Sequence, residues 1–166
     1  MMNKSVKLGI QGRPDVPPRL FDLVPRYIEK YGYKDCLFAG KVNKQWVKYD
    51  GKKFYEITNS ISYGLLKLGV KKGDRIALIA NNAPEWNMID FAIQQVGAIC
   101  IPIYPTISHD DYKYIFNHSE ASIAFFTNKH LYSKVADIIV DIPTIKETYL
   151  IRASEDMKSL QDLIDL

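Results

Sequence analysis

The stretch Arg75-Ile76-Ala77-Leu78-Ile79-Ala80 decides the fold. Every residue after Arg75 is apolar, and a short continuous apolar run is typical of a parallel strand covered on both faces. The polar turn Lys71-Lys72-Gly73-Asp74 precedes it. Asn81-Asn82-Ala83-Pro84 follows it and sets Pro84 where a helix begins. The sequence therefore predicts a buried strand with a turn and a helix directly after it.

The same pattern of an apolar strand followed by a turn and a helix repeats downstream. Further strands are expected at residues 99–103, 122–126 and around 148–151, and the segments between them have helical character. These helices begin at Pro84, at Ser108 as an N-cap, and at Lys129, the last running to about Val140. Strands separated by helices need crossover connections, so the sheet should be largely parallel. The fold class is therefore α/β.

Upstream, a small helix and a β-hairpin come first. Apolar residues at helical spacing predict a helix over residues 20–30, or one that begins near Val24 with Pro25 in its first turn. Residues 36–39 and 45–49 predict an edge hairpin around the polar loop 40–44. An amphipathic helix then runs from Phe54 to Leu68 and stops at Gly69.

Two domain boundaries follow from composition. Residues 1–18 are polar and proline-rich and are read as an N-terminal arm, with residues 19–166 as a single domain. An apolar helical stripe begins at Met157 and has no sequel after Leu166. We therefore expect this domain to be truncated at its C-terminal end, with an exposed apolar surface on the last helix.

Charge and cysteine content exclude several classes of protein. Lysine and arginine exceed aspartate and glutamate by 22 − 19 = 3, too few to indicate nucleic-acid binding. The basic cluster at residues 67–72 is read as a helix end rather than a phosphate-binding patch. No run approaches the roughly 20 apolar residues of a transmembrane helix, and no signal peptide is evident. Cys36 and Cys100 lack CxxC spacing and are read as buried free thiols of a cytoplasmic protein.

Catalytic motifs are missing from the sequence. The glycines are scattered and form no phosphate loop, no GxSxG nucleophile elbow occurs, and no GxGxxG follows the first parallel strand. We therefore assign no catalytic, cofactor-binding or metal-binding residue to this chain.

Three local patterns each allow a functional interpretation and a simpler structural one. His109 with Asp110 and Asp111 fits a metal site, but a helix N-terminus favours the same residues and is the preferred interpretation. The pair at residues 81–82 lies where α/β proteins bind ligands, although the preference of asparagine for turns explains it more simply. Of the neighbouring tyrosines at 112 and 114, at most one needs to point inward.

Four stretches also carry a resemblance: Gly64 to Leu78 (GLLKLGVKKGDRIAL), Asn81 to Trp86 (NNAPEW), Gly97 to Thr106 (GAICIPIYPT) and Tyr114 to Ala121 (YIFNHSEA). In this order they resemble the early part of AMP-forming acyl-CoA synthetases, over roughly residues 20–150. The segment Ile103-Tyr104-Pro105-Thr106 is more similar to sequences of the long-chain fatty acid branch than to those of the acetate, aryl or peptide-synthetase branches. By this resemblance the motifs at Gly73, Pro84–Trp86, Pro102 and Pro105 have scaffolding roles.

The resemblance implies a ligase that converts ATP, a fatty acid and coenzyme A to acyl-CoA, AMP and pyrophosphate with the help of Mg²⁺. The family's phosphate loop, its adenine and ribose contacts and its adenylating lysine lie further along such chains and are absent from these residues. The chain is therefore expected to be part of a ligase, inactive alone, with the remainder of the parent chain as its partner. For the oligomeric state of the ligase, a homodimer is an alternative to a monomer. Two other readings stay open: a fragment of a medium-chain or aryl acid ligase, and a free-standing α/β ligand-binding module.

Overall fold

The computed structural model describes residues 19–42 and 44–166, and the expected arm at residues 1–18 lies outside them. A 3-10 turn, η1 (Leu20–Asp22), comes first. The helices are α1 (Leu23–Tyr31), α2 (Gly51–Lys67), α3 (Pro84–Gln95), α4 (His109–Ser119), α5 (Lys129–Ser133), α6 (Ala136–Asp141) and α7 (Leu160–Ile164). The strands are β1 (Phe38–Val42), β2 (Gln45–Tyr49), β3 (Arg75–Ile79), β4 (Ile99–Ile103), β5 (Ile123–Phe126) and β6 (Glu147–Leu150).

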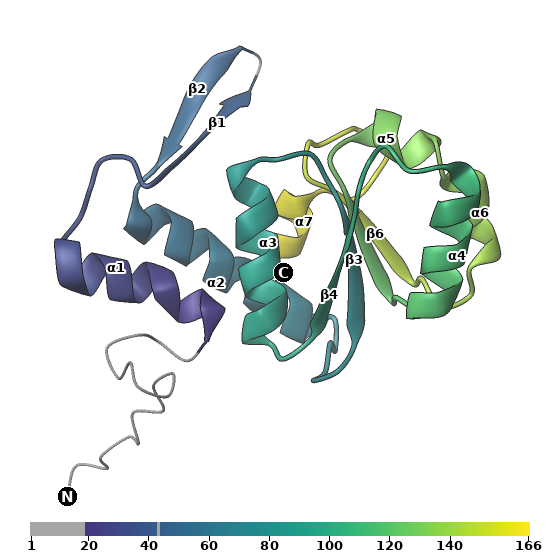
Figure 1. The fold of residues 1–166 in the computed structure, drawn as a ribbon, viewed down its shortest axis with the longest axis horizontal. Coiled ribbons are helices and arrows are strands. Elements are labelled where there is room, and N and C mark those ends of the chain that lie inside the picture. Colours follow the sequence, from purple (N-terminus) through teal and green to yellow (C-terminus); the bar gives the residue numbers. More distant parts are fainter. Residues whose placement is uncertain (1–18, 43) are drawn as a thin grey trace, which may run out of the picture.

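A four-stranded parallel sheet in the order β4-β3-β5-β6 forms the centre of the molecule (Figure 1). The strand at residues 75–79 lies inside it, with Ile76 paired to Cys100 on one side and to Ile123 on the other. The α/β prediction is confirmed, and the central strand is the one whose continuous apolar run led to it.

Alternate residues of β3 enter different cores because successive side chains of a strand point to opposite faces. Ile76 and Leu78 belong to the core beneath α2, α3 and α7. Ala77 and Ile79 belong to the core beneath α4, α5 and α6. Figure 1 shows these two groups of helices on opposite sides of the sheet. Both faces of the strand are therefore buried, which explains why it contains no polar residue after Arg75.

The β1–β2 hairpin forms a separate antiparallel pair. Its first strand begins at Phe38 and reaches Val42, so the loop expected over residues 40–44 is shorter than predicted. Cys36 therefore precedes the strand, and its side chain is exposed. The expectation of a buried thiol there was wrong, while Cys100 is half-buried.

The start of α1 and the end of α2 follow the predicted signals, whereas α2 begins at Gly51, before the expected Phe54. Pro25 is the third residue of α1, where no helical N–H is lost, so the later of the two expected starts is the observed one. Asp50 caps α2 by accepting from the Lys53 N–H at 2.8 Å. Gly69, with φ +83°, closes it, and Val70 N donates to Leu65 O. The basic cluster at residues 67–72 thus lies at a helix end, as predicted.

One helix was predicted where the structure has two. The segment expected to be helical over residues 129–140 is divided at Val135, whose φ of −132° leaves the helical region. The bend lets Leu131, Val135 and Ile138 all enter the core on this face. Burial of these side chains outweighs continuation of the helix, and no residue in the segment is a helix breaker that would reveal it.

The last helix was expected to expose its apolar stripe, and this expectation was wrong. α7 packs on α2 within the same chain, with Leu163 fully buried and Leu160 nearly so. Gly64 of α2 provides the space, because a Cβ there would lie 2.9 Å from Leu163 Cγ. Leu160, Leu163 and Ile164 therefore complete the core on this side of the sheet, whereas Met157 packs against the opposite core and Leu166 is 54% exposed.

None of the helices in the described ranges combines the length and apolar character that a bilayer crossing requires.

Candidate functional site

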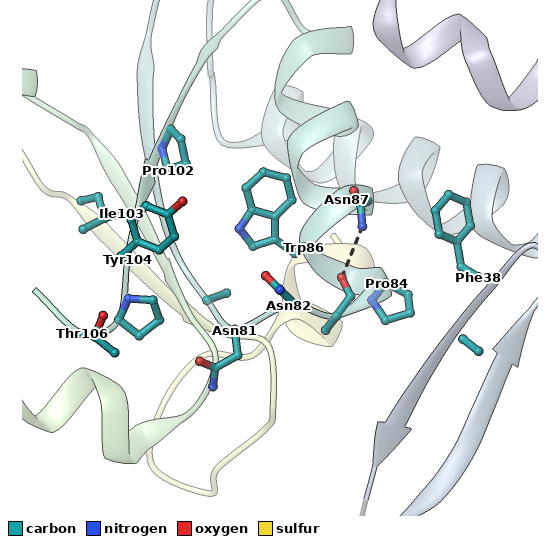
Figure 2. Close-up of a pocket in the computed structure, with 14 residues that line it drawn as sticks. Phe38, Asn81, Asn82, Pro84, Trp86, Asn87, Pro102, Ile103, Tyr104 and Thr106 are labelled. Atoms are coloured by element: carbon teal, nitrogen blue, oxygen red, sulfur yellow. Dashed lines mark hydrogen bonds between the residues drawn. The ribbon is translucent and has the colours of Figure 1, made fainter.

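An open cleft of about 950 Å³ lies at the carboxyl end of β3 and β4, beside the start of α3 and the base of the hairpin. Its lining is Phe38, Ala39, Ala80, Asn81, Asn82, Ala83, Pro84, Trp86, Asn87, Pro102, Ile103, Tyr104, Pro105 and Thr106. In Figure 2, Trp86 lies at the centre of the labelled set, with the β4 residues on one side and Pro84, Asn87 and Phe38 on the other. This edge is where parallel α/β sheets place their ligands.

The turn after β3 positions the polar part of the cleft. Asn81 is held by a hydrogen bond from its backbone N–H to Thr127 Oγ1 at 2.9 Å. Asn87 Nδ2 donates to Ala83 O at 3.5 Å, as the dashed line in Figure 2 shows. Asn81 and Asn82 both line the cleft and also form the turn after β3, so the turn interpretation and the ligand interpretation both remain hypotheses for this pair.

The hairpin supplies the far wall. Gly40 packs directly against Pro84, since a Cβ at position 40 would lie 2.7 Å from Pro84 Cδ. Phe38 stacks on Phe54 of α2 with ring centroids 4.1 Å apart. These two contacts fix the base of the hairpin against the helices, so the wall formed by Phe38 and Ala39 has a defined position.

The fourteen residues that line the cleft include no charged side chain, no histidine and no cysteine. They offer aromatic and proline surfaces together with three side-chain amides. Such a lining can hold an apolar or neutral hydrogen-bonding group, and among the fourteen residues only the hydroxyls of Tyr104 and Thr106 are groups of the kind that take part in proton transfer or nucleophilic attack.

Glu85, which stands between the cleft residues Pro84 and Trp86 in the sequence, belongs to a partly buried ion pair. Arg152 Nη1 donates to Glu85 Oε1 at 2.7 Å, and Tyr49 Oη donates to the same oxygen at 3.1 Å. The cluster joins three elements: the end of the hairpin, the first turn of α3 and the segment after β6. Arg152 is brought there by its own N–H, which donates to Thr127 O at the edge of the sheet.

The environment of Glu85 shifts two pKa values. Burial acts to raise the pKa of Glu85, but the Arg152 hydrogen bond, backbone hydrogen bonding, the Arg152 charge and the Tyr49 hydroxyl together hold it below its ordinary value. Burial, and then the charge of Glu85, raise the pKa of Tyr49. Glu85 is thus a buried carboxylate at neutral pH, and its other oxygen, Oε2, has no hydrogen-bond partner among the described residues.

Sequence reasoning treated Glu85 only as part of a helix start and did not single out Arg152. The available signal was a carboxylate in the first turn of a helix, where exposed N–H groups favour negative charge. The partners of Glu85 lie 36 and 67 residues away, a separation that no local pattern could bridge.

His109 and its acidic neighbours form a helix start, as preferred from the sequence. Ser108 and Asp111 make a capping box, with the Asp111 N–H donating to Ser108 Oγ at 3.2 Å. His109 Nε2 lies 2.8 Å from Asp137 Oδ2 on the surface, and this hydrogen bond holds the pKa of Asp137 below its ordinary range. Over residues 19–42 and 44–166, no three histidine, cysteine or acidic side chains are arranged to hold a metal ion.

Comparison with known proteins identifies relatives of this chain. The family described as AMP-binding enzyme matches residues 25–163. The long-chain-fatty-acid–CoA ligase FadD15 of Mycobacterium bovis is 35% identical over 91 residues, which cover 55% of this chain and 15% of the relative. Fatty acyl-CoA synthetase A of Dictyostelium discoideum is 32% identical over 101 residues, covering 60% of this chain and 15% of the relative. The matched segment thus spans about a seventh of the length of these relatives.

Solved structures share the fold. A long-chain-fatty-acid-CoA ligase (FadD1) from Archaeoglobus fulgidus superposes with a TM-score of 0.74 at 21% identity, over 87% of this chain and 29% of that one. The anthranilate CoA ligase AuaEII, solved with anthranoyl-AMP, gives a TM-score of 0.72 at 19% identity, over 87% of this chain and 26% of that one. The match to the family extends over nearly the whole chain and agrees with the observed fold: the chain belongs to the AMP-binding enzyme family.

Proposed function

We propose that this chain is the N-terminal part of a long-chain fatty acid–CoA ligase, which joins a fatty acid to coenzyme A through an acyl-adenylate. The observation that carries the proposal is the identity of 35% over 91 residues and of 32% over 101 residues to two fatty acyl-CoA ligases. The proposal assigns ATP, Mg²⁺ and coenzyme A to the whole ligase, and places it in the cytoplasm, where free Cys36 and Cys100 stay reduced.

The residues that line the cleft do not fit MgATP by themselves. Mg²⁺ prefers carboxylate oxygens, and the cleft lining contains none. A helix N-terminus can hold phosphate, but α3 begins with Pro84, which lacks an N–H, and Glu85, whose charge repels an anion. We therefore propose that the rest of the ligase provides the nucleotide site and that this chain alone does not form an adenylate.

Within the proposed ligase, the uncharged cleft contacts neutral groups only. Its aromatic and proline side chains can pack against apolar groups of a ligand, and its three side-chain amides can form hydrogen bonds with neutral polar groups. The cleft thus acts as scaffold and wall, and the chemistry takes place on other residues.

A ligase for aryl acids is the second candidate, and the observation in its favour is the similarity in fold to the anthranilate CoA ligase. The TM-scores of the anthranilate CoA ligase (0.72) and of the long-chain-fatty-acid-CoA ligase (0.74) are too similar to favour either candidate function. The long-chain ligase is preferred because the two relatives matched in sequence at 35% and 32% identity are fatty acyl-CoA ligases.

ATP–pyrophosphate exchange tests the proposal. The 166-residue chain should give only background exchange with palmitate, whereas the ligase that contains it should exchange with palmitate in preference to anthranilate or octanoate. Robust exchange by the chain alone would refute its role as a part. Preference for anthranilate would favour the aryl ligase, and binding of a small ligand by a chain whose gene encodes no ligase would favour the free-standing module.

A further inference from the structure

The outer face of the β1–β2 hairpin is basic and carries an exposed aromatic ring. Side chains at Ala39, Lys41, Trp46 and Lys48 share this face, because Lys41 pairs directly with Trp46 and Ala39 with Lys48. Trp46 is 63% exposed, and Lys41 Nζ lies 5.0 Å from the centre of its ring. Figure 1 shows the strands β1 and β2 projecting away from the helices.

No negative charge offsets these lysines. Residues 38–49 contain Lys41, Lys44 and Lys48 but no aspartate or glutamate. In the described part of the chain the lysines that form ion pairs are Lys52, Lys129 and Lys158. The hairpin thus concentrates positive charge that forms no ion pair with residues 19–42 or 44–166.

Protection of an open edge accounts for only part of this pattern. Lysines on short edge strands prevent pairing with other chains, and both hairpin strands have an open edge. An exposed tryptophan has the opposite effect, since it adds apolar area where association should be avoided. Trp46 among three lysines therefore requires a partner that is both anionic and partly apolar.

We infer that the outer face of the β1–β2 hairpin docks on an anionic phospholipid surface. Tryptophan rings lie at the level of lipid headgroups, and lysines gain from the negative potential of a cytoplasmic leaflet. Nucleic acid fits less well, because single strands stack on several aromatic rings along a groove and this face carries one. The preference for lipid also rests on the proposed function, whose fatty acid substrates partition into membranes.

Binding of the chain to vesicles tests the inference. We expect it to co-sediment with phosphatidylcholine vesicles containing phosphatidylglycerol and not with phosphatidylcholine alone, and binding should weaken at high salt. The variant K41Q/K44Q/K48Q should lower the partition coefficient about a hundredfold, at about fivefold per lysine. The control K67Q/K71Q/K72Q removes the same charge from the exposed end of α2 and should retain binding.

Fluorescence adds a readout that does not depend on charge. Trp46 and Trp86 are the two tryptophans, so the difference between the parent chain and Trp46→Phe isolates the emission of Trp46. That emission should shift to the blue on anionic vesicles and be quenched by brominated lipids. Absence of vesicle binding, equal weakening by both triple variants, or binding to single-stranded RNA in place of vesicles would overturn the inference. No nucleotide or turnover is involved, so failure here leaves the ligase proposal intact.

Discussion

Arg152 Nη1 lies 2.7 Å from Glu85 Oε1, and the bond joins the end of the sheet to the first turn of α3. Glu85 is nearly buried, so the arginine is what makes its charge tolerable in that position. Because Tyr49 donates to the same carboxylate oxygen, the pair also anchors the hairpin that forms one wall of the cleft.

Removal of the arginine should therefore destabilise the chain. We expect Arg152→Met to lower the free energy of unfolding by about 1–3 kcal/mol, because it leaves a buried carboxylate with one fewer donor. Urea unfolding followed by circular dichroism measures the change. Lys158→Met is the matched control, since its pair with Glu147 is largely exposed and should contribute at most about 1 kcal/mol. Equal losses for both variants would contradict the special role of Arg152.

The same pair predicts a reversal in pH dependence. With the pKa of Glu85 below its ordinary value, its contribution to stability is present above that ordinary value and is lost as pH falls through the folded-state pKa. In Arg152→Met, burial should raise the pKa instead, so the carboxyl contribution would be lost as pH rises. Urea midpoints between about pH 3 and pH 7 should show opposite slopes, measured against Glu85→Gln as the reference without this group. Parallel slopes in parent and variant would refute the assignment.

Local sequence predicts some elements well for a physical reason. The run after Arg75 alternates between two cores, so both faces demand apolar residues and the signal is unambiguous. The order of the strands was not predictable, because short apolar strands such as those at residues 99–103 and 123–126 look alike in sequence. Their places depend on which helix covers which face, a property of the assembled fold.

The candidate site was predictable only in part. Asn81 and Asn82 directly follow a predicted parallel strand, and the carboxyl edge of such a sheet is the expected ligand position. The opposite wall comes from Phe38, whose contact with α2 is long-range. The pairing of Glu85 with Arg152 is likewise tertiary and leaves no trace in local spacing.

The two neighbouring tyrosines of α4 offer a direct test of its orientation. Tyr112 is buried and donates through its hydroxyl to Tyr104 O at 3.1 Å, whereas Tyr114 is 65% exposed. Tyr112→Ala should cost about 3–5 kcal/mol, and Tyr114→Ala should stay within about 0.5 kcal/mol. Thermal unfolding of both variants checks this, and a large loss for Tyr114→Ala would place the wrong face of α4 on the sheet.

The capping box at the start of α4 should carry more stability than the histidine beside it. Ser108→Ala removes the acceptor for the Asp111 N–H and should cost about 0.5–2 kcal/mol. His109→Ala removes only an exposed pair with Asp137, so its effect should be under about 1 kcal/mol. The urea midpoints of the two variants, each compared with that of the parent chain, show whether the capping box or the histidine contributes more to stability. A larger loss of stability for His109→Ala than for Ser108→Ala would favour the metal hypothesis. So would a parent chain that Zn²⁺ stabilises, if His109→Ala abolishes that stabilisation.

The contact between Gly64 and Leu163 decides whether α7 belongs to this domain. Alanine normally stabilises a helix interior relative to glycine by about 1 kcal/mol, yet Gly64→Ala should destabilise this chain by about 1–3 kcal/mol. The added Cβ would collide with the backbone oxygen of Leu163 and press on its side chain, which forces α7 away from α2. Ser60→Ala, one turn earlier on the same helix, is the control and should be nearly neutral. Light scattering should reveal association in Gly64→Ala alone, because displacement of α7 exposes the apolar surface that it now covers. A more stable, monomeric Gly64→Ala variant would mean that α7 does not pack here and that its apolar stripe is covered in some other way.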